Sequence, residues 1–192
     1  AALEMMSERG FSATGVDAIC RQAGIVKTAL YWHFGSKEGL LAAVLERVSH
    51  EWIDEIRKSA DPTGAPLERL DHALAGIRHI LETRPRHLRL LLSVLLERSE
   101  TDPISRATLG RIFTQARDAL QHGLEDTLGR SIPGLDEIAD TMLALMQSAA
   151  LRRLAEPEAL DLDRLFTHIR RLALLMIDDA MRRAGVGPSG AL

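Results

Sequence analysis

The sequence predicts an all-α protein in which an N-terminal three-helix head is joined by a long helix to a C-terminal helical bundle, about nine helices in total. Aromatic residues make up only 4% of the 192 residues, whereas residues that favour helices are abundant. Apolar residues recur every three or four positions in segments such as 40–56. Short segments containing Pro or Gly separate these runs. A chain of this length with 46% hydrophobic residues can bury roughly 70% of its unfolded surface.

Composition also limits the function classes. A single cysteine, Cys20, excludes an intramolecular disulfide and a multi-cysteine zinc site. We expect it to be a small buried residue rather than a reactive thiol. Charged residues interrupt every long apolar run, so we expect neither a bilayer span nor a signal peptide but a cytoplasmic protein. We expect no cofactor.

The helix boundaries follow from capping residues. Gly10 ends the first helix, and Gly35 ends the third. Thr14 and Asp17 have the spacing of a capping box at the start of the second helix, and Ser36 is expected to cap the fourth. The nine predicted helices are 1–9, 14–23, 27–34, 36–60, 67–82, 85–98, 103–128, 135–154 and 162–184.

The long helix 36–60 is expected to be on the order of 37 Å long, enough to connect two bodies. The segment 61–66 should break it, and the tail 185–190 should be frayed. We predict a DNA-binding domain over 1–45 and a ligand-binding and dimerisation domain over 46–192.

The second and third helices, joined by a short turn with Gly24, fit a helix-turn-helix. One inward set should hold them together: Val16, Ile19, Ala23, Ile25, Leu30 and Phe34. With Leu30 and Phe34 buried, the outer face carries Lys27, Thr28, Ala29, Tyr31, Trp32 and His33. This face suits a major groove. The alternative is that Tyr31 and Trp32 pack against a neighbouring helix.

Charge sharpens the prediction. The net charge is −3, and within residues 1–40 four basic residues match four acidic ones. DNA binding would therefore rely on a few placed contacts rather than a basic field. Because the chain opens directly in a helical pattern without Met, we expect upstream residues, with room for a basic arm.

The head resembles the N-terminal signature of the tetracycline-repressor (TetR) family. The residues that carry this resemblance, over roughly 1–45, are Phe11, Thr14, Val16, Ile19, Ala23-Gly24, Leu30-Tyr31-Trp32-His33-Phe34 and Ser36-Lys37-Glu38-Gly39-Leu40-Leu41. It implies an all-α homodimer that represses transcription from a palindromic DNA operator and is released by a small molecule.

By position, the resemblance implies DNA-contacting roles for nine residues. The recognition helix would supply Lys27, Thr28, Ala29, Tyr31, Trp32 and His33. Thr14 and Gly15 would present the second helix to a phosphate, and Lys37 would contact the backbone. Val26 and Gly15 depart from the Ser or Thr common in the family at these positions.

The helices at 135–154 and 162–184 are apolar on more than one face. We expect them to pair with their symmetry mates in a homodimer.

Eight residues are candidates to line an effector cavity: Trp52, His79, His87, Leu91, Leu95, Phe113, Met142 and Met146. Their character favours an apolar or aromatic ligand, although such residues at helical spacing are more often plain core. The sequence names neither the effector nor the operator.

Two other function classes stay open. His79 with Glu82, and His122 with Glu125, have a spacing similar to that of di-metal carboxylate sites in helical bundles, but in reversed order. Solvent-facing helix surfaces explain both pairs better, so an enzyme is not expected. A helical module that binds protein through its head is the other alternative.

Overall fold

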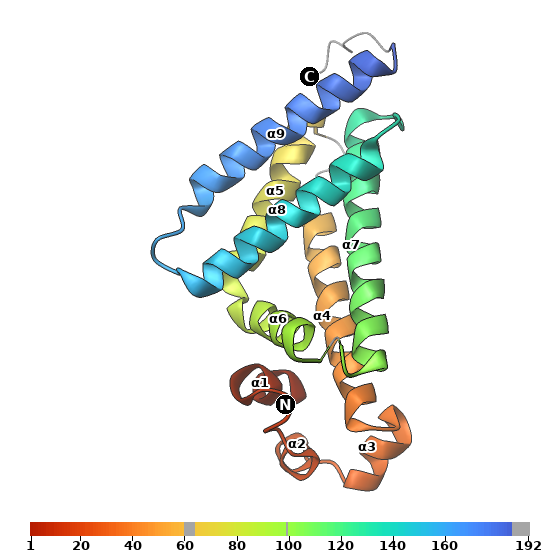
Figure 1. The fold of residues 1–192 in the computed structure, drawn as a ribbon, viewed down its shortest axis with the longest axis vertical. Coiled ribbons are helices and arrows are strands. Elements are labelled where there is room, and N and C mark those ends of the chain that lie inside the picture. Colours follow the sequence, from red (N-terminus) through yellow and green to blue (C-terminus); the bar gives the residue numbers. More distant parts are fainter. Residues whose placement is uncertain (60–63, 99, 186–192) are drawn as a thin grey trace. The chain divides into compact units, whose positions relative to one another are not determined.

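The computed structural model describes residues 1–59, 64–98 and 100–185. Within these ranges the chain forms nine helices and no strand (Figure 1). They are α1 (Ala2–Arg9), α2 (Val16–Ala23), α3 (Lys27–Phe34), α4 (Lys37–Ser59), α5 (Pro66–Thr83), α6 (Pro85–Arg98), α7 (Pro103–Leu128), α8 (Leu135–Ala155) and α9 (Leu162–Arg183). The all-α prediction is therefore confirmed.

Most helix boundaries lie where capping chemistry predicts them. Gly10 and Gly35 have positive φ angles of 80° and 72° directly after α1 and α3. Ser36 Oγ accepts a hydrogen bond from the backbone N–H of Gly39 at 3.0 Å, as predicted for the start of α4. Proline opens α5, α6 and α7, because the first helical position needs no backbone donor. Most of the predicted break at 61–66, and all of the tail beyond Gly185, lie outside the described residues.

The described chain forms two compact units. The first comprises Ala1–Glu51 and Arg84–Phe113, so α6 and the start of α7 belong to the same unit as the head. Helix α1 packs against α6 in this unit. Its core is formed by buried apolar residues from six helices and from the α1–α2 connection: Met5, Met6, Phe11, Ile19, Cys20, Leu30, Leu40, Leu41, Leu45, Leu90, Val94, Leu109 and Ile112.

Two members of the predicted inward set are not buried. Ala23 is exposed, and Ile25 is 43% exposed. Both lie where α2 ends and the turn begins, beyond the point at which the two helices pack. Cys20 is buried, as expected for a small core residue.

The second unit comprises Trp52–Thr83 and Thr114–Leu192. Helices α8 and α9 lie side by side (Figure 1), and both pack on α5. Asp161 caps α9 by accepting a hydrogen bond from the Arg164 N–H at 2.9 Å. In the described ranges, no helix combines the length and the hydropathy that a membrane span requires.

Candidate functional site

Helices α2 and α3 are joined by a tight left-handed turn. Gly24 has φ 68° and ψ 28°, a conformation that glycine adopts without steric cost. The N–H of Ile25 donates to the carbonyl of Cys20 at 3.0 Å. This bond closes a Schellman-type end to α2. It sends the chain directly into α3, which is the geometry of a helix-turn-helix.

The predicted capping box at Thr14 is wrong. Helix α2 begins at Val16, with Gly15 as its N-cap and no side-chain capping bond. Thr14 is 1% exposed. Its hydroxyl lies 3.1 Å from the Met5 carbonyl oxygen and 2.7 Å from that of Gly10, so it ties α2 to the end of α1 instead.

Helix α3 is anchored at two positions, as predicted. Leu30 is 1% exposed, and Phe34 packs against the same core. The His33 ring meets the Phe34 ring edge-on, with 4.5 Å between centroids. Leu30 and Phe34 therefore hold the helix and leave its other face free.

The outer face of α3 is open to solvent. Trp32 is 88% exposed and Tyr31 41%, while the side chains of Lys27, Thr28, Ala29 and His33 are also exposed. An indole that is 88% exposed packs against none of the helices that the structure describes, so the packing alternative is wrong for Trp32. All six residues predicted for this face are therefore brought together on one accessible surface.

The positive charge on this face is partly matched. Lys27 Nζ lies 3.0 Å from Asp17 Oδ1, and the hydrogen bond to Asp17 raises the pKa of Lys27. Both side chains are well exposed, and exposed ion pairs of this kind are weak. Lys27 can therefore exchange Asp17 for a stronger anionic partner.

Lys37 is engaged inside the first unit. Its Nζ donates to the Phe11 carbonyl at 2.6 Å and lies 4.2 Å from the centroid of the Phe11 ring. Burial lowers the pKa of Lys37. The side chain fastens the α1–α2 connection to the start of α4.

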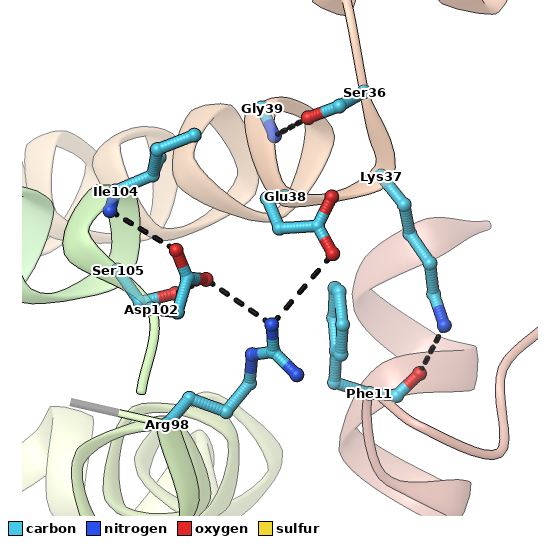
Figure 2. A network of polar contacts seen from close by, with 9 residues as sticks. All are labelled: Phe11, Ser36, Lys37, Glu38, Gly39, Arg98, Asp102, Ile104 and Ser105. Carbon is cyan, nitrogen blue, oxygen red and sulfur yellow. Dashed lines mark hydrogen bonds and ion pairs between the residues drawn. The ribbon is translucent and has the colours of Figure 1, made fainter. Parts of the chain in front are cut away.

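A polar network continues from Phe11 to α6 and α7 (Figure 2). The Arg98 guanidinium lies 4.0 Å from the centroid of the Phe11 ring. One of its Nη atoms lies 3.6 Å from a Glu38 carboxylate oxygen and 3.3 Å from one of Asp102. Arg98 therefore connects the end of α6 to the start of α4 and to the α1–α2 connection.

Asp102 holds the other end of this network. Its carboxylate accepts hydrogen bonds from the Ile104 N–H at 3.0 Å and the Ser105 hydroxyl at 2.7 Å (Figure 2). Burial alone would raise the pKa of Asp102, but the hydrogen bonds from Ser105, Arg98 and Ile104 outweigh it and lower the pKa. The position of Asp102 before Pro103 signals a helix cap, whereas nothing local in the sequence indicates the role of Arg98.

The second unit contains a cavity of about 60 Å³ between α4, α5, α7 and α8. Its lining is apolar apart from one threonine: Ile56, Leu70, Ala73, Leu74, Ile77, Ala119, Leu120, Gly123, Leu124, Thr127, Met142 and Met146. The α7 residues of this wall are absent from the sequence-based prediction, because their spacing is the same as that of ordinary core.

Only two of the eight predicted effector-cavity residues, Met142 and Met146, line this cavity. Trp52 and His79 belong to the same unit but lie outside the lining, and His79 Nε2 lies 3.9 Å from Glu55. The other four belong to the first unit: His87, Leu91, Leu95 and Phe113. Leu91, Leu95 and Phe113 pack there against the head core.

The His/Glu pairs considered for metal have other surroundings. His122 Nδ1 lies 2.6 Å from the Asp118 carbonyl, and Glu125 accepts hydrogen bonds from Gln121 and Ser131. Across the described residues, no three His, Cys, Asp or Glu side chains converge on a possible metal position.

Comparisons with known proteins point to one class. Residues 1–44 match the family described as bacterial regulatory proteins, tetR family. The chain is 28% identical over 145 residues to the HTH-type transcriptional activator FasR of Mycolicibacterium smegmatis, covering 76% of this chain and 63% of FasR. It is 29% identical over 173 residues to the HTH-type transcriptional repressor DhaR of Mycobacterium sp. strain GP1, covering 85% of this chain and 84% of DhaR.

A solved structure agrees with these relatives. A TetR-like transcriptional regulator from Rhodococcus sp. RHA1 superposes with a TM-score of 0.67 at 25% identity, covering 92% of this chain and 91% of that one. The chain spans less than two thirds of the length of FasR. These relatives and fold neighbours are regulators of transcription and not enzymes.

The first prediction concerns the junction between α3 and α4. A Cβ atom at Gly39 would lie 2.1 Å from the carbonyl oxygen of Phe34, the last residue of α3. Gly39→Ala should therefore lower the free energy of unfolding by about 1–3 kcal/mol, measured by urea unfolding. The control is Gly110→Ala, where nothing lies within 4 Å and helix propensity predicts a gain of about 0.5–1 kcal/mol. Equal stability of the Gly39 variant and the parent protein would show that the junction is not tight.

The second prediction concerns pH. Because the pKa of Asp102 is lowered in the folded state, its stabilisation should be fully present above its unfolded pKa, near 4, and be lost as the pH falls through the folded value. Asp102→Asn should cost about 1–3 kcal/mol at pH 7 and should flatten the fall in stability at acid pH. Urea midpoints from pH 7 to pH 3 test this, with Asp136→Asn, an exposed first-turn carboxylate on α8, as control. An unchanged acid slope in the Asp102 variant would contradict the prediction.

Proposed function

The chain belongs to the TetR family of bacterial regulatory proteins, and from this premise we propose that it binds a palindromic operator as a homodimer and leaves it when a small effector binds. It is a DNA-binding regulator of transcription. We place its action in the cytoplasm, where a bacterial operator lies. The observation that carries the proposal is the exposed outer face of α3.

The contact set is assigned to this face. Trp32 and Tyr31 offer apolar surface to thymine methyl groups, and Lys27, Thr28 and His33 offer polar groups to phosphates or base edges. Ala29 leaves room for close approach. Gly15, at the N-cap of α2, presents backbone N–H groups to a phosphate.

Thr14 and Lys37 take indirect roles in this proposal. The Thr14 side chain is buried, and the Lys37 ammonium is bonded to Phe11. We therefore assign both to holding α2 and α4 in position, and leave the phosphate contact near Thr14 to the backbone of Gly15.

Exposed apolar residues on α8 and α9 support the homodimer. Leu151 is 53% exposed, Leu172 45% and Leu175 55%, although each lies on a helix that already buries another face. Pairing these helices across a two-fold axis would cover them. Two heads would then read half-sites about 34–36 Å apart, or multiples of that distance.

The proposed division of labour follows the chain. Residues 1–45 read DNA, and residues 46–192 bind the effector and the partner subunit. Only two residues separate the end of α3 from the start of α4, and Ile56 of α4 lines the cavity. An effector that prefers one position of α4 would change the spacing of the two heads and so the affinity for the operator.

Repression is the proposed direction. The relatives include an activator, FasR, and a repressor, DhaR. The match to DhaR covers 84% of that protein, whereas the match to FasR covers 63%. A regulator matched over most of its length is the better guide to how the whole chain acts.

A third prediction tests operator binding. Trp32→Ala should weaken binding to DNA from upstream of the protein's own gene about 10- to 100-fold, because it removes a direct groove contact. Unfolding should be unchanged because the side chain is 88% exposed. Gel retardation at several salt concentrations measures both the affinity and the salt slope, which should be shallow for so few cations.

The matched control is Leu96→Ala, which removes a 77% exposed apolar side chain from α6 and should leave affinity unchanged. If the parent protein retards no DNA at low salt, the operator proposal fails and the protein-binding alternative takes its place. If the parent protein and the Trp32 variant bind DNA with equal affinity, the outer face of α3 is not part of the DNA interface.

A fourth prediction tests the homodimer. Leu175→Glu places a charge on the α9 surface assigned to the partner subunit and should convert a dimer to a monomer at micromolar concentration, because an unpaired buried charge is costly. Light scattering measures the mass. Leu96→Glu, outside α8 and α9, should remain dimeric. A monomeric parent protein would refute the proposed dimer. A dimeric Leu175 variant would show that the interface does not include Leu175.

A further inference from the structure

The side chain of Arg69, which is not itself a lining residue, is bonded to a residue of the cavity wall in the second unit. Arg69 lies on α5 directly before the lining residue Leu70 and one turn before the lining residue Ala73. One of its Nη atoms donates to the backbone carbonyl of Thr127 at 3.1 Å. Thr127 itself lines the cavity, so the guanidinium is fastened to the cavity wall.

Arg69 has at least one hydrogen-bond donor without an acceptor. Its Nε is buried and has no hydrogen-bond partner, and no carboxylate in the described part of the chain forms an ion pair with it. A guanidinium does not lose its proton at physiological pH. A buried charged donor without an acceptor is costly. A ligand that supplied an acceptor would form the hydrogen bond that Nε lacks.

The lining of the cavity determines which chemical group of such a ligand it can hold. Apart from Thr127, its lining offers only apolar side chains and glycine. At about 60 Å³ it is less than half of the roughly 150 Å³ that accommodates benzene in an engineered apolar cavity. A short alkyl or small aromatic group enters if Met142 and Met146 shift, and methionine side chains adapt readily to such changes.

We propose that this cavity binds a small amphipathic carboxylic acid, with its apolar part in the cavity and its carboxylate on Arg69. The inference rests on the proposed effector response, because it names the chemical class of that effector. The guanidinium Nε–H and a neighbouring Nη–H match the two oxygens of a carboxylate. A neutral molecule of the same shape leaves Nε unpaired.

The test compares acids with their primary amides, which have nearly the same shape but no charge. Isothermal titration of the full chain uses hexanoate against hexanamide and phenylacetate against phenylacetamide. The acid of at least one pair should bind about tenfold more tightly than its amide, the range expected for a charge-assisted hydrogen bond.

Variants at Arg69 assign the preference to this side chain. Arg69→Gln should bring the acid-to-amide ratio to about one while changing amide affinity less than about twofold. Arg69→Lys, which keeps the charge but not the planar pair of donors, should give an intermediate ratio. Arg89→Gln, an exposed position on α6, is the control and should behave as the parent. Thermal melting shows whether each variant is folded. If Arg69→Gln does not fold, the acid-to-amide ratio of Arg69→Lys is the test.

The outcomes separate this inference from the operator proposal. Equal binding of acid and amide, retention of the preference in Arg69→Gln, or no binding of either acid up to about 10 mM overturns the carboxylate site. Gel retardation without any acid tests operator binding separately. If an acid binds through Arg69 but leaves the operator complex intact, the site stands and its role as effector site fails.

Discussion

The head of this protein depends on how the ring of Phe11 is held. Phe11 is 4% exposed, and two cations lie against its ring, Lys37 at 4.2 Å and Arg98 at 4.0 Å from the centroid. One comes from α4 and the other from α6, so a single aromatic side chain joins the α1–α2 connection to both helices (Figure 2). A cation over an aromatic face is held more strongly at a desolvated site than at an exposed one, and burial lowers the pKa of Lys37.

That arrangement explains why the recognition face can be so exposed. Helix α3 has only eight residues, too few to be stable alone in water, and its outer face gains nothing from packing. Its stability comes from Leu30 and Phe34 on one side and from the tight junction to α4 on the other. Because α4 is in turn fastened through Lys37 and Glu38 to Phe11 and Arg98, Trp32 and Tyr31 are free to serve recognition.

Local chemistry made most of the fold predictable. Glycine after α1 and α3, serine before α4 and proline at the start of three helices act on their own neighbours, so their effects can be inferred from sequence alone. The predicted capping box at Thr14 was wrong because the Thr14 hydroxyl bonds to the carbonyl of Met5, which lies on another helix. Arg98 was missed because its partners Phe11 and Glu38 are far away in sequence. The cavity was only partly predicted because the spacing of apolar residues on α7 is the same whether they line a cavity or pack in a filled core.

In the described part of the chain, two arginines have a buried Nε atom without a hydrogen-bond partner, Arg98 and Arg69, and their surroundings are opposite. Arg98 has carboxylates from Glu38 and Asp102 beside its Nη and an aromatic ring against its face, so its charge is matched within the protein. Among the described residues, Arg69 has only the Thr127 carbonyl as a hydrogen-bond partner, and Thr127 lines the apolar cavity. The same unpaired atom is therefore a minor packing cost at Arg98, where two anions compensate. At Arg69, where no described anion does, the uncompensated charge is the feature that gives the cavity a chemical preference.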